Sequence, residues 1–255
     1  MGVTLVTGAS SGIGRSLARR LAADGSPVAL LARRKPLLES LVQEIEALGG
    51  RALAIPCDVT ERARVHEAVR AAEAELGAIE CLVANAGGGG PTSAEALEAG
   101  HVDGIFRLNV LGVVHCIEAV LPAMLARGSG HLVAVSSLAA WRGLPGAGAY
   151  CAAKAALGAL MESLRLDLAP RGVRVTLLSP GFVRTRTGPR AQARRRRPLE
   201  MELEDATRRM HRAIRARRRA YAFPLPLALA VAVGRLLPAA LYDSLLAGRG
   251  RRPRP

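Results

Sequence analysis

Six short apolar runs separated by amphipathic stretches constrain the fold of this chain more than any other feature. The runs are Val3–Thr7, Val28–Leu31, Ala52–Ile55, Cys81–Ala84, Leu132–Val135 and Val173–Leu178. Between the second and the third run, apolar residues recur at the three- and four-residue intervals of a helix: Leu37, Leu41, Ile45 and Leu48. Strands that alternate with helices form βαβ units, whose parallel sheet is covered by helices on both faces. The sequence therefore predicts an α/β fold built on a single doubly wound parallel sheet.

A glycine-rich loop follows the first apolar run and leads into an amphipathic stretch, residues 15–23. In doubly wound sheets, ligands bind beyond the carboxyl ends of the strands, and glycines there let a pyrophosphate approach the free N–H groups of the next helix. The spacing G-x-x-x-G-x-G differs from the commoner G-x-G-x-x-G, and a plain strand-to-helix turn is the alternative. We expect this loop to bind a dinucleotide through Gly8, Ser10, Ser11, Gly12, Ile13 and Gly14.

Charge is distributed unevenly along the 255 residues. The net charge is +15, yet residues 1–183 carry 17 basic and 16 acidic side chains, whereas residues 184–255 carry 19 basic and 5 acidic ones. Only 3% of the residues are aromatic, and the arginine runs are not interleaved with aromatic side chains that stack on bases. We therefore expect no nucleic-acid partner.

The composition changes after Pro180 and predicts three parts. Residues 1–185 form a nucleotide-binding and catalytic core, residues 186–222 an Arg-rich lid or insertion with the last strand of the same domain, and residues 223–255 an apolar C-terminal extension with a basic tail. The four cysteines are widely spaced, with no C-x-x-C and no histidine at ligand spacing, so we expect reduced thiols and no metal site. No basic-then-apolar leader precedes Val3, and we expect a cytoplasmic location.

Tyr150 and Lys154 lie four residues apart in an Ala-rich, helix-favouring stretch, so they share one helix face. A free tyrosine has a pKa of about 10, and a nearby ammonium lowers that pKa toward the working range because it stabilises the phenolate. Lys154 is one of only two lysines among 36 basic residues. Because the chain otherwise uses arginine for positive charge, a lysine here indicates that position 154 requires a compact ammonium, which a guanidinium fork cannot replace. The pair is therefore predicted to transfer a proton.

Further motifs occur in a fixed order along residues 3–185. They are Asp58 after the third strand, Asn85-Ala86-Gly87 after the fourth, Asn109, Ser137 thirteen positions before Tyr150, Pro180-Gly181, and Thr185. With these motifs, the glycine loop and Tyr150-x-x-x-Lys154, the chain resembles the short-chain dehydrogenase/reductase family. The resemblance implies a Rossmann-type sheet and an oxidoreductase that passes hydride between a nicotinamide cofactor and a small-molecule carbonyl or alcohol.

The resemblance also implies roles for single residues. Ser137 would hydrogen-bond the substrate oxygen, Tyr150 would deliver its proton during reduction, and Lys154 would lower the tyrosine pKa and hold the nicotinamide ribose. Asn109 would order a water in the proton path. Besides the glycine loop, the implied cofactor contacts are Asp58, Val59, Asn85, Ala86, Gly87, Tyr150, Lys154, Pro180, Gly181, Val183 and Thr185. The alternatives are a serine that caps backbone and an asparagine that bonds neighbouring backbone.

The end of the second strand favours NADP(H) over NAD(H). An acid at this position would bind the ribose 2′-hydroxyl of NAD and repel a 2′-phosphate. Here the strand runs into Arg33 and Arg34, and a guanidinium forms paired hydrogen bonds to phosphate. The alternative is a solvated surface arginine.

The substrate pocket is expected to be bordered by Gly87–Pro91, by Leu138–Gly148 with Trp141, and by Phe182. The apolar character of these segments favours a hydrophobic carbonyl compound. The competing function is a non-catalytic NADP-binding regulatory or scaffold protein on the same fold.

The C-terminal extension departs from the family, many members of which end in a short strand and a D-G-G-like tail that helps to form a tetramer. From Phe223 to Tyr242 the only charge is Arg235, but three prolines and Gly234 interrupt the stretch. A transmembrane helix, an interfacial membrane contact, and packing on the domain or a partner subunit are the alternatives. With the basic tail, the hypothesis is peripheral contact with an anionic membrane. We expect a homodimer or a higher homo-oligomer.

Overall fold

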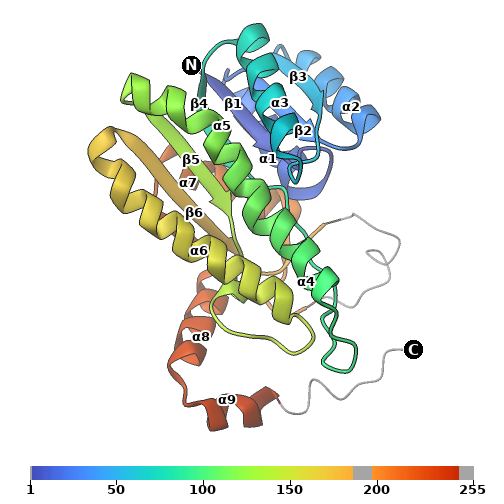
Figure 1. The fold of residues 1–255 in the computed structure, drawn as a ribbon, viewed down its shortest axis with the longest axis vertical. Helices are drawn as coiled ribbons and strands as arrows, with labels where there is room; N and C mark the ends of the chain where they lie inside the picture. Colours follow the sequence, from blue (N-terminus) through green and yellow to red (C-terminus); the bar gives the residue numbers. More distant parts are fainter. Residues whose placement is uncertain (1, 186–196, 247–255) are drawn as a thin grey trace.

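The computed structural model describes residues 2–185 and 197–246 (Figure 1). The expected Arg-rich segment 186–196 and the basic tail 247–255 therefore lie outside the described residues. All six predicted apolar runs form strands of one sheet. A further strand near the C-terminus completes this sheet at one edge.

The central sheet has seven strands in the order β3-β2-β1-β4-β5-β6-β9, and every neighbouring pair is parallel. Its strands are β1 (Val3–Thr7), β2 (Val28–Ala32), β3 (Ala52–Pro56), β4 (Ile79–Ala84), β5 (Gly130–Val135), β6 (Val173–Pro180) and β9 (Ala220–Phe223). Strands β2 and β3 lie on one side of β1, and β4, β5, β6 and β9 lie on its other side, so the strand order reverses at β1. Ligands of doubly wound sheets bind at the carboxyl edge beside such a reversal.

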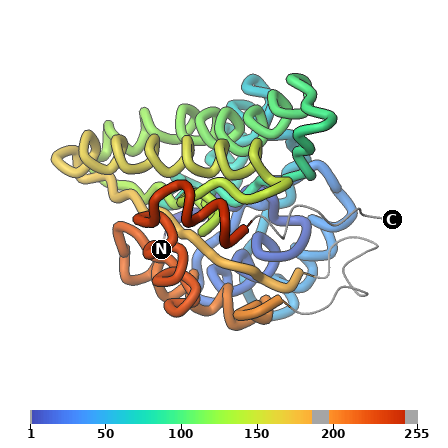
Figure 2. Tube along the Cα trace, turned by 90° about the horizontal axis from the view of Figure 1, so that it is seen from below, coloured from blue at the N-terminus to red at the C-terminus, as the bar shows by residue number. Residues whose placement is uncertain are grey.

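Helices cover both faces of the sheet, with α3, α5 and α6 on one face and α1, α2 and α7 on the other (Figure 2). The bounds are α1 (Gly12–Ala23), α2 (Lys35–Glu46), α3 (Arg62–Leu76), α4 (Ala99–Phe106), α5 (Gly112–Arg127), α6 (Gly148–Leu168), α7 (Leu203–Arg215), α8 (Leu225–Leu236) and α9 (Ala239–Leu246). Shorter elements are a π-helical turn, Arg107–Leu111, the 3₁₀ turns Leu138–Ala140 and Ala169–Arg171, and the paired strands β7 (Val183–Arg184) and β8 (Met201–Glu202). The predicted doubly wound α/β fold is confirmed.

The apolar stripe expected between the second and third strands is only partly correct. Helix α2 buries Leu38, Leu41 and Ile45, whereas Leu37 is exposed and Leu48 is 75% exposed. Leu37 lies one position away from the face that meets the sheet. Leu48 follows the end of the helix at Glu46, where the chain turns into β3. The two leucines therefore belong to the correct segment but not to its buried face.

Helix α7 forms where the Arg-rich part of the sequence also has helical periodicity. Its first turn carries Glu204 and Asp205 and its last turn Arg212 and Arg215, a distribution that complements the helix dipole. Its buried face packs against α1 and the sheet. Arg20 of α1 pairs with Glu204 at 2.5 Å. This segment is thus a layer of the main fold.

One continuous helical stretch, from α4 through the π-helical turn to α5, is long and apolar enough to cross a membrane by length and composition alone. It is the only such stretch among residues 2–185 and 197–246. A single helix of this kind is weak evidence for a span, because a core helix passes the same test. Here α5 packs against α3 and against strands β4 and β5.

Candidate active site

A cavity of about 770 Å³ lies at the carboxyl edge of the sheet. Its lining contains almost all of the predicted site residues: Gly8, Ser10, Ser11, Gly12, Ile13, Arg33, Arg34, Asp58, Val59, Asn85, Ala86, Gly87, Ser137, Tyr150, Lys154, Pro180, Gly181, Val183 and Thr185. Two predicted residues, Gly14 and Asn109, do not line it. The segments that meet here follow β1, β2, β3, β4, β5 and β6, so the parallel sheet brings distant parts of the sequence together.

The glycine loop forms a narrow cradle at the N-terminus of α1. Gly8 and Gly12 have positive φ angles of 66° and 55°, a conformation that side chains disfavour. A Cβ at Gly14 would lie 2.3 Å from the carbonyl oxygen of Gly8, so Gly14 allows the helix to pack against the loop instead of contacting a ligand. The first turn of α1 contains no acidic residue. This arrangement fits a pyrophosphate, because free N–H groups at a helix N-terminus bind anions.

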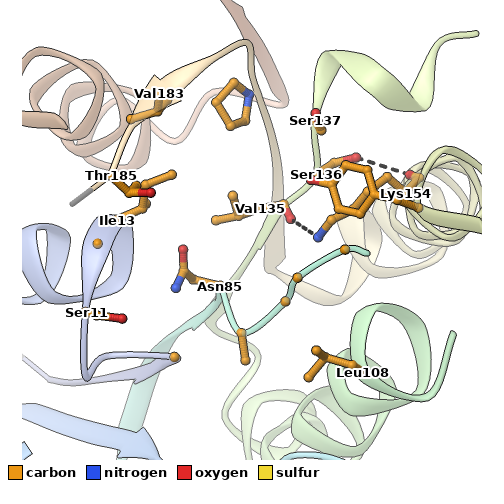
Figure 3. Close-up of a pocket in the computed structure, with 18 of the residues that line it drawn as sticks. Ser11, Ile13, Asn85, Leu108, Val135, Ser136, Ser137, Lys154, Val183 and Thr185 are labelled. Atoms are coloured by element: carbon orange, nitrogen blue, oxygen red, sulfur yellow. Dashed lines mark hydrogen bonds between the residues drawn. The ribbon is translucent and has the colours of Figure 1, made fainter. Parts of the chain in front are cut away.

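Asn85 and Ala86 are fastened to the end of β1 by Thr7. The Thr7 Oγ1 accepts hydrogen bonds from the backbone N–H groups of Asn85 at 3.0 Å and Ala86 at 2.9 Å. The Asn85 Nδ2 donates to the Thr7 carbonyl oxygen at 3.0 Å. The ends of two neighbouring strands are thereby held together, and Figure 3 shows Asn85 among the residues that line the cavity.

Asn109 lies behind the cavity wall in the π-helical turn, a distortion that often marks functional sites. Its Nδ2 donates to the carbonyl oxygens of Gly88 at 2.7 Å and Ile105 at 2.9 Å, and its Oδ1 accepts from the Gly88 N–H at 3.3 Å. Asn109 therefore positions the glycine run that borders the cavity. Its amide is satisfied by backbone, the alternative that the sequence left open.

Two arginines and one aspartate frame the end of β2. The Arg34 guanidinium donates to Ser10 Oγ at 2.9 Å and to Ser11 Oγ at 2.7 Å, which ties it to the glycine loop. The Arg33 guanidinium lies 3.6 Å from Asp58 Oδ2 but is mostly exposed. Burial raises the pKa of the Asp58 carboxyl, but hydrogen bonds from Thr60 and the charge of Arg33 outweigh it, so that this pKa lies below its usual value. The result is an anionic Asp58 beside the Arg33 cation.

Ser137, Tyr150 and Lys154 converge on the other half of the cavity. Ser137 lies two residues after the end of β5 at Val135. Tyr150 and Lys154 lie in the first two turns of α6. The Lys154 ammonium is almost fully buried and donates to the Val135 carbonyl oxygen at 2.9 Å (Figure 3). Ser136 Oγ donates to the Lys154 carbonyl oxygen at 3.1 Å, which joins the strand end to the helix. Ser137 Oγ also accepts from the Ala139 N–H at 3.1 Å, so it caps the 3₁₀ turn.

The expected lowering of the Tyr150 pKa by Lys154 is not found in this structure. Burial raises the pKa of the Tyr150 hydroxyl, and a side-chain hydrogen bond with Ser137 opposes this rise without reversing it. The Lys154 Nζ lies 5.9 Å from the centre of the tyrosine ring, and its proton is directed to Val135. Burial lowers the pKa of Lys154 to about 8. Burial thus outweighs the Ser137 hydrogen bond in setting the pKa of Tyr150, and it favours the protonated hydroxyl.

Comparison with known proteins agrees with this geometry. The family model for short chain dehydrogenases matches residues 2–196. The chain belongs to the short-chain dehydrogenase family. An uncharacterised oxidoreductase of Myxococcus xanthus is 44% identical over 240 residues, which cover 94% of each chain. The protein is therefore an oxidoreductase of this family.

Solved structures of family members have the same fold. A short-chain dehydrogenase from Streptomyces avermitilis is 30% identical, with 99% of each chain covered and a TM-score of 0.81. An alcohol dehydrogenase from Thermococcus sibiricus, complexed with 5-hydroxy-NADP, is 27% identical over 88% of this chain and 96% of its own, with a TM-score of 0.78. The family binds NAD or NADP, and the glycine cradle of this chain has the form that such a nucleotide requires.

Sequence reasoning missed or misplaced several lining residues of this family member. Trp141 and Phe182 were expected at the pocket but are not in the cavity lining, and Phe182 instead lies under the Arg197 guanidinium at 4.5 Å. The lining residues that were not predicted are Ala32, Cys57, Leu108, Val135, Ser136 and Arg197. Most of them directly adjoin a predicted residue or end a strand. What could have identified most of them in the sequence is their position at or just after the end of a predicted strand, because their side-chain types have nothing in common.

Proposed function

We propose that this protein transfers hydride between NADP(H) and a carbonyl or alcohol group, with Tyr150 as the general acid and base. One observation carries the proposal: Ser137, Tyr150 and Lys154 line the same cavity as the glycine cradle of α1. A fold of this kind does not by itself imply turnover. An ionisable hydroxyl, a second hydroxyl and a buried ammonium at one wall are the groups that proton transfer needs.

Each residue has a role that follows from its contacts. The α1 cradle and Asn85 would hold the nucleotide, which supplies or accepts the hydride when bound. The Tyr150 hydroxyl, kept protonated by burial, donates a proton to the substrate oxygen during reduction. Ser137 Oγ hydrogen-bonds the same oxygen, and Lys154 places a positive charge beside the tyrosine. Asn109 holds the glycine run Gly87–Gly88 against this site. Its amide is already bonded to backbone, so the predicted ordering of a water in the proton path would act through the backbone that Asn109 positions.

The preference for NADP(H) over NAD(H) is supported by charge at the end of β2. Arg33 and Arg34 line the cavity where the ribose of a bound nucleotide is expected. Arg34 is already oriented toward the glycine loop by its bonds to Ser10 and Ser11. The solved alcohol dehydrogenase from Thermococcus sibiricus carries an NADP derivative, which favours the same choice.

A hydrophobic carbonyl compound is the substrate class that fits the half of the cavity beside Ser137, Tyr150 and Lys154, which we call the substrate half. Pro91, Leu108 and Ala147 line this half, and Gly89 lies so close to Tyr150 that a Cβ there would be 2.8 Å from the ring. The absence of a side chain at Gly89 thus lets the glycine run pack directly against the Tyr150 ring. The homo-oligomeric state and the cytoplasmic location stay predictions.

The deciding experiment follows NADPH oxidation with a panel of aldehydes and ketones. Tyr150→Phe should lower kcat by about 10²–10⁴-fold, because general acid catalysis contributes on that scale, while NADPH affinity changes little. Tyr221→Phe is the matched control, because the Tyr221 ring stacks on Phe223 in β9 and does not line this cavity. Tight NADPH binding without turnover of any carbonyl would favour the regulatory or scaffold function.

A peripheral membrane contact is the second proposal, and an exposed apolar face supports it. Helices α8 and α9 present Leu225, Leu229, Val233, Leu236, Leu241 and Leu245 to solvent, and Leu236 is 84% exposed. On α8 these residues repeat at helical spacing, so they form one stripe. Four arginines, 249, 251, 252 and 254, follow α9 in the sequence and complement an anionic bilayer. Apolar burial combined with this attraction is what interfacial binding requires.

Sedimentation with liposomes tests the membrane contact. The full chain should pellet with acidic vesicles at low salt, and Leu229→Glu with Val233→Glu should reduce pelleting more than tenfold, because burying two charges in the bilayer interface is unfavourable. Neutral vesicles are the control. Recovery of the wild type in the supernatant with acidic vesicles would contradict the proposal. Conversion of a dimer to a monomer by the two substitutions would assign the stripe to a second copy instead.

A further inference from the structure

Arg142 links the substrate side of the cavity to the C-terminal helices. It lies in the loop between the 3₁₀ turn Leu138–Ala140 and α6. Its Nη1 donates to the carbonyl oxygens of Gly234 at 2.5 Å, Arg235 at 3.2 Å and Leu237 at 2.9 Å. These carbonyls end α8, where the last turn of a helix lacks partners and favours a cation. A residue 92 positions earlier in the chain thus caps this helix.

The next helix is fastened to the same loop. The Arg142 guanidinium lies 3.9 Å from the centre of the Tyr242 ring, and the Tyr242 hydroxyl donates to the Gly143 carbonyl oxygen at 2.7 Å. A cation over an aromatic face is attracted by the negative potential of the ring, so this contact adds to the hydrogen bonds. Two consecutive loop residues are therefore joined to two consecutive helices, α8 and α9.

The same loop continues into the cavity wall. Gly146 and Ala147, which lie between Ser137 and Tyr150 in the sequence, both line the cavity. On the inner side, the Gly146 carbonyl oxygen accepts from the Thr92 N–H at 2.9 Å. The loop is thus held by Thr92 at one end and by Arg142 at the other.

Helix α8 also supports the opposite wall. A Cβ at Gly181 would lie 2.6 Å from Leu227 Cδ2 and 3.2 Å from Pro224 Cδ, so α8 packs directly on this segment. Gly181 lines the cavity together with Pro180. Helix α8 therefore packs against the cavity-lining Gly181, and both α8 and α9 are joined to the loop that carries Gly146 and Ala147.

We propose that Arg142 is a positioning residue: it fixes the loop 141–147 to α8 and α9 and so sets the shape of the substrate half of the cavity. The proposal rests on the proposed function for its kinetic consequence but not for its structural one. Arg142 does not line the cavity and touches no reacting atom. Its effect reaches the substrate through Gly146 and Ala147.

Hydrogen–deuterium exchange tests the structural link without any substrate. In Arg142→Ala, amides of residues 138–149 and 234–246 should exchange at least tenfold faster, because both ends of the link lose their partner. Arg235→Ala is the matched control: it removes an equal charge from α8 but keeps the carbonyl that Arg142 binds. Unchanged exchange in both segments of a folded Arg142→Ala protein would overturn the proposal.

Kinetics then separate positioning from general destabilisation. With a confirmed carbonyl substrate, Arg142→Ala should raise KM about tenfold with a smaller change in kcat and an unchanged Kd for NADPH, since displaced cavity walls weaken substrate placement. Arg142→Lys should recover part of the KM, because an ammonium still donates to the α8 carbonyls. An equal loss of NADPH affinity would indicate a global effect and contradict the proposal. Absence of all carbonyl turnover in the wild type would refute the proposed function, and the exchange experiment would still decide the role of Arg142.

Discussion

The two halves of the cavity are built in different ways. The nucleotide half is made mainly of backbone: Gly8 turns the chain with a positive φ, Gly14 lets α1 approach, and N–H groups of Asn85 and Ala86 bind Thr7. The substrate half is made of side chains and segments far apart in sequence, such as the Arg142 link to α8. A backbone site requires particular residues at fixed spacing, whereas a packed site accepts many sequences.

This difference predicts that the two halves respond differently to substitution. Glycines at a close approach have no substitute, because any Cβ collides with main-chain atoms that cannot move far. Apolar walls tolerate exchanges that keep volume. We therefore expect changes in the nucleotide half to abolish a general property, nucleotide binding, and changes in the substrate half to alter selectivity.

The largest effect on nucleotide binding is expected from Gly14→Ala. The added Cβ would lie 2.3 Å from the Gly8 carbonyl oxygen and 2.6 Å from Asn85 Nδ2, so α1 must shift away from the loop. NADPH affinity should fall at least about a hundredfold and the free energy of unfolding by about 1–3 kcal/mol, as for an overpacked core. Fluorescence titration and chemical denaturation measure the two quantities.

The control for Gly14→Ala is Gly104→Ala in α4, where a Cβ meets nothing within 4 Å. That substitution should leave NADPH affinity unchanged and raise stability by about 0.5–1 kcal/mol, because alanine favours the helix. Near-normal NADPH binding by Gly14→Ala would show that the cradle is not a backbone-defined site.

An intermediate effect is expected at the end of β2. The double substitution Arg33→Ala with Arg34→Ala should weaken NADPH binding about tenfold to a hundredfold, the scale of one or two lost charge-assisted hydrogen bonds, while NADH affinity changes little. Calorimetry with both nucleotides measures this selectivity. Lys35→Ala is the control, since it removes an adjacent cation that pairs with Glu39. Tighter binding of NADH than NADPH by the wild type would refute the preference.

The smallest expected effect is a pH dependence of carbonyl reduction. Because burial lowers the pKa of Lys154 to about 8 and raises that of Tyr150, the protonated tyrosine and the ammonium coexist below about pH 8. The kcat/KM for reduction should be level below this pH and fall severalfold above it, where Lys154 loses its charge. In Lys154→Arg the rate should be lower, but the decline should move to higher pH, because a guanidinium stays charged. A wild-type rate that increases through pH 8 would contradict this assignment.

Much of the fold could be predicted from the sequence, and the particular successes and failures share a cause. Val3–Thr7 forms β1 over its predicted span because a short apolar run that ends at a glycine-rich turn has few alternatives in a buried parallel sheet. The stripe of α2 was misassigned at Leu37 and Leu48, because periodicity does not show where a helix ends or which side meets the sheet. Trp141 and Phe182 were expected at the border of the pocket as members of apolar segments near the site, and both lie outside its lining.

The sequence by itself determined the doubly wound sheet, the glycine cradle and the gathering of Ser137, Tyr150 and Lys154, because each depends on local backbone geometry or on the parallel order of strands. Tertiary structure decided the rest. Burial set the direction of the Tyr150 and Lys154 pKa values, since desolvation depends on every neighbour in space. Packing likewise decided that Asn109 bonds the Gly88 backbone and that Arg142 caps a helix formed 83 to 94 residues later, contacts that no local pattern encodes.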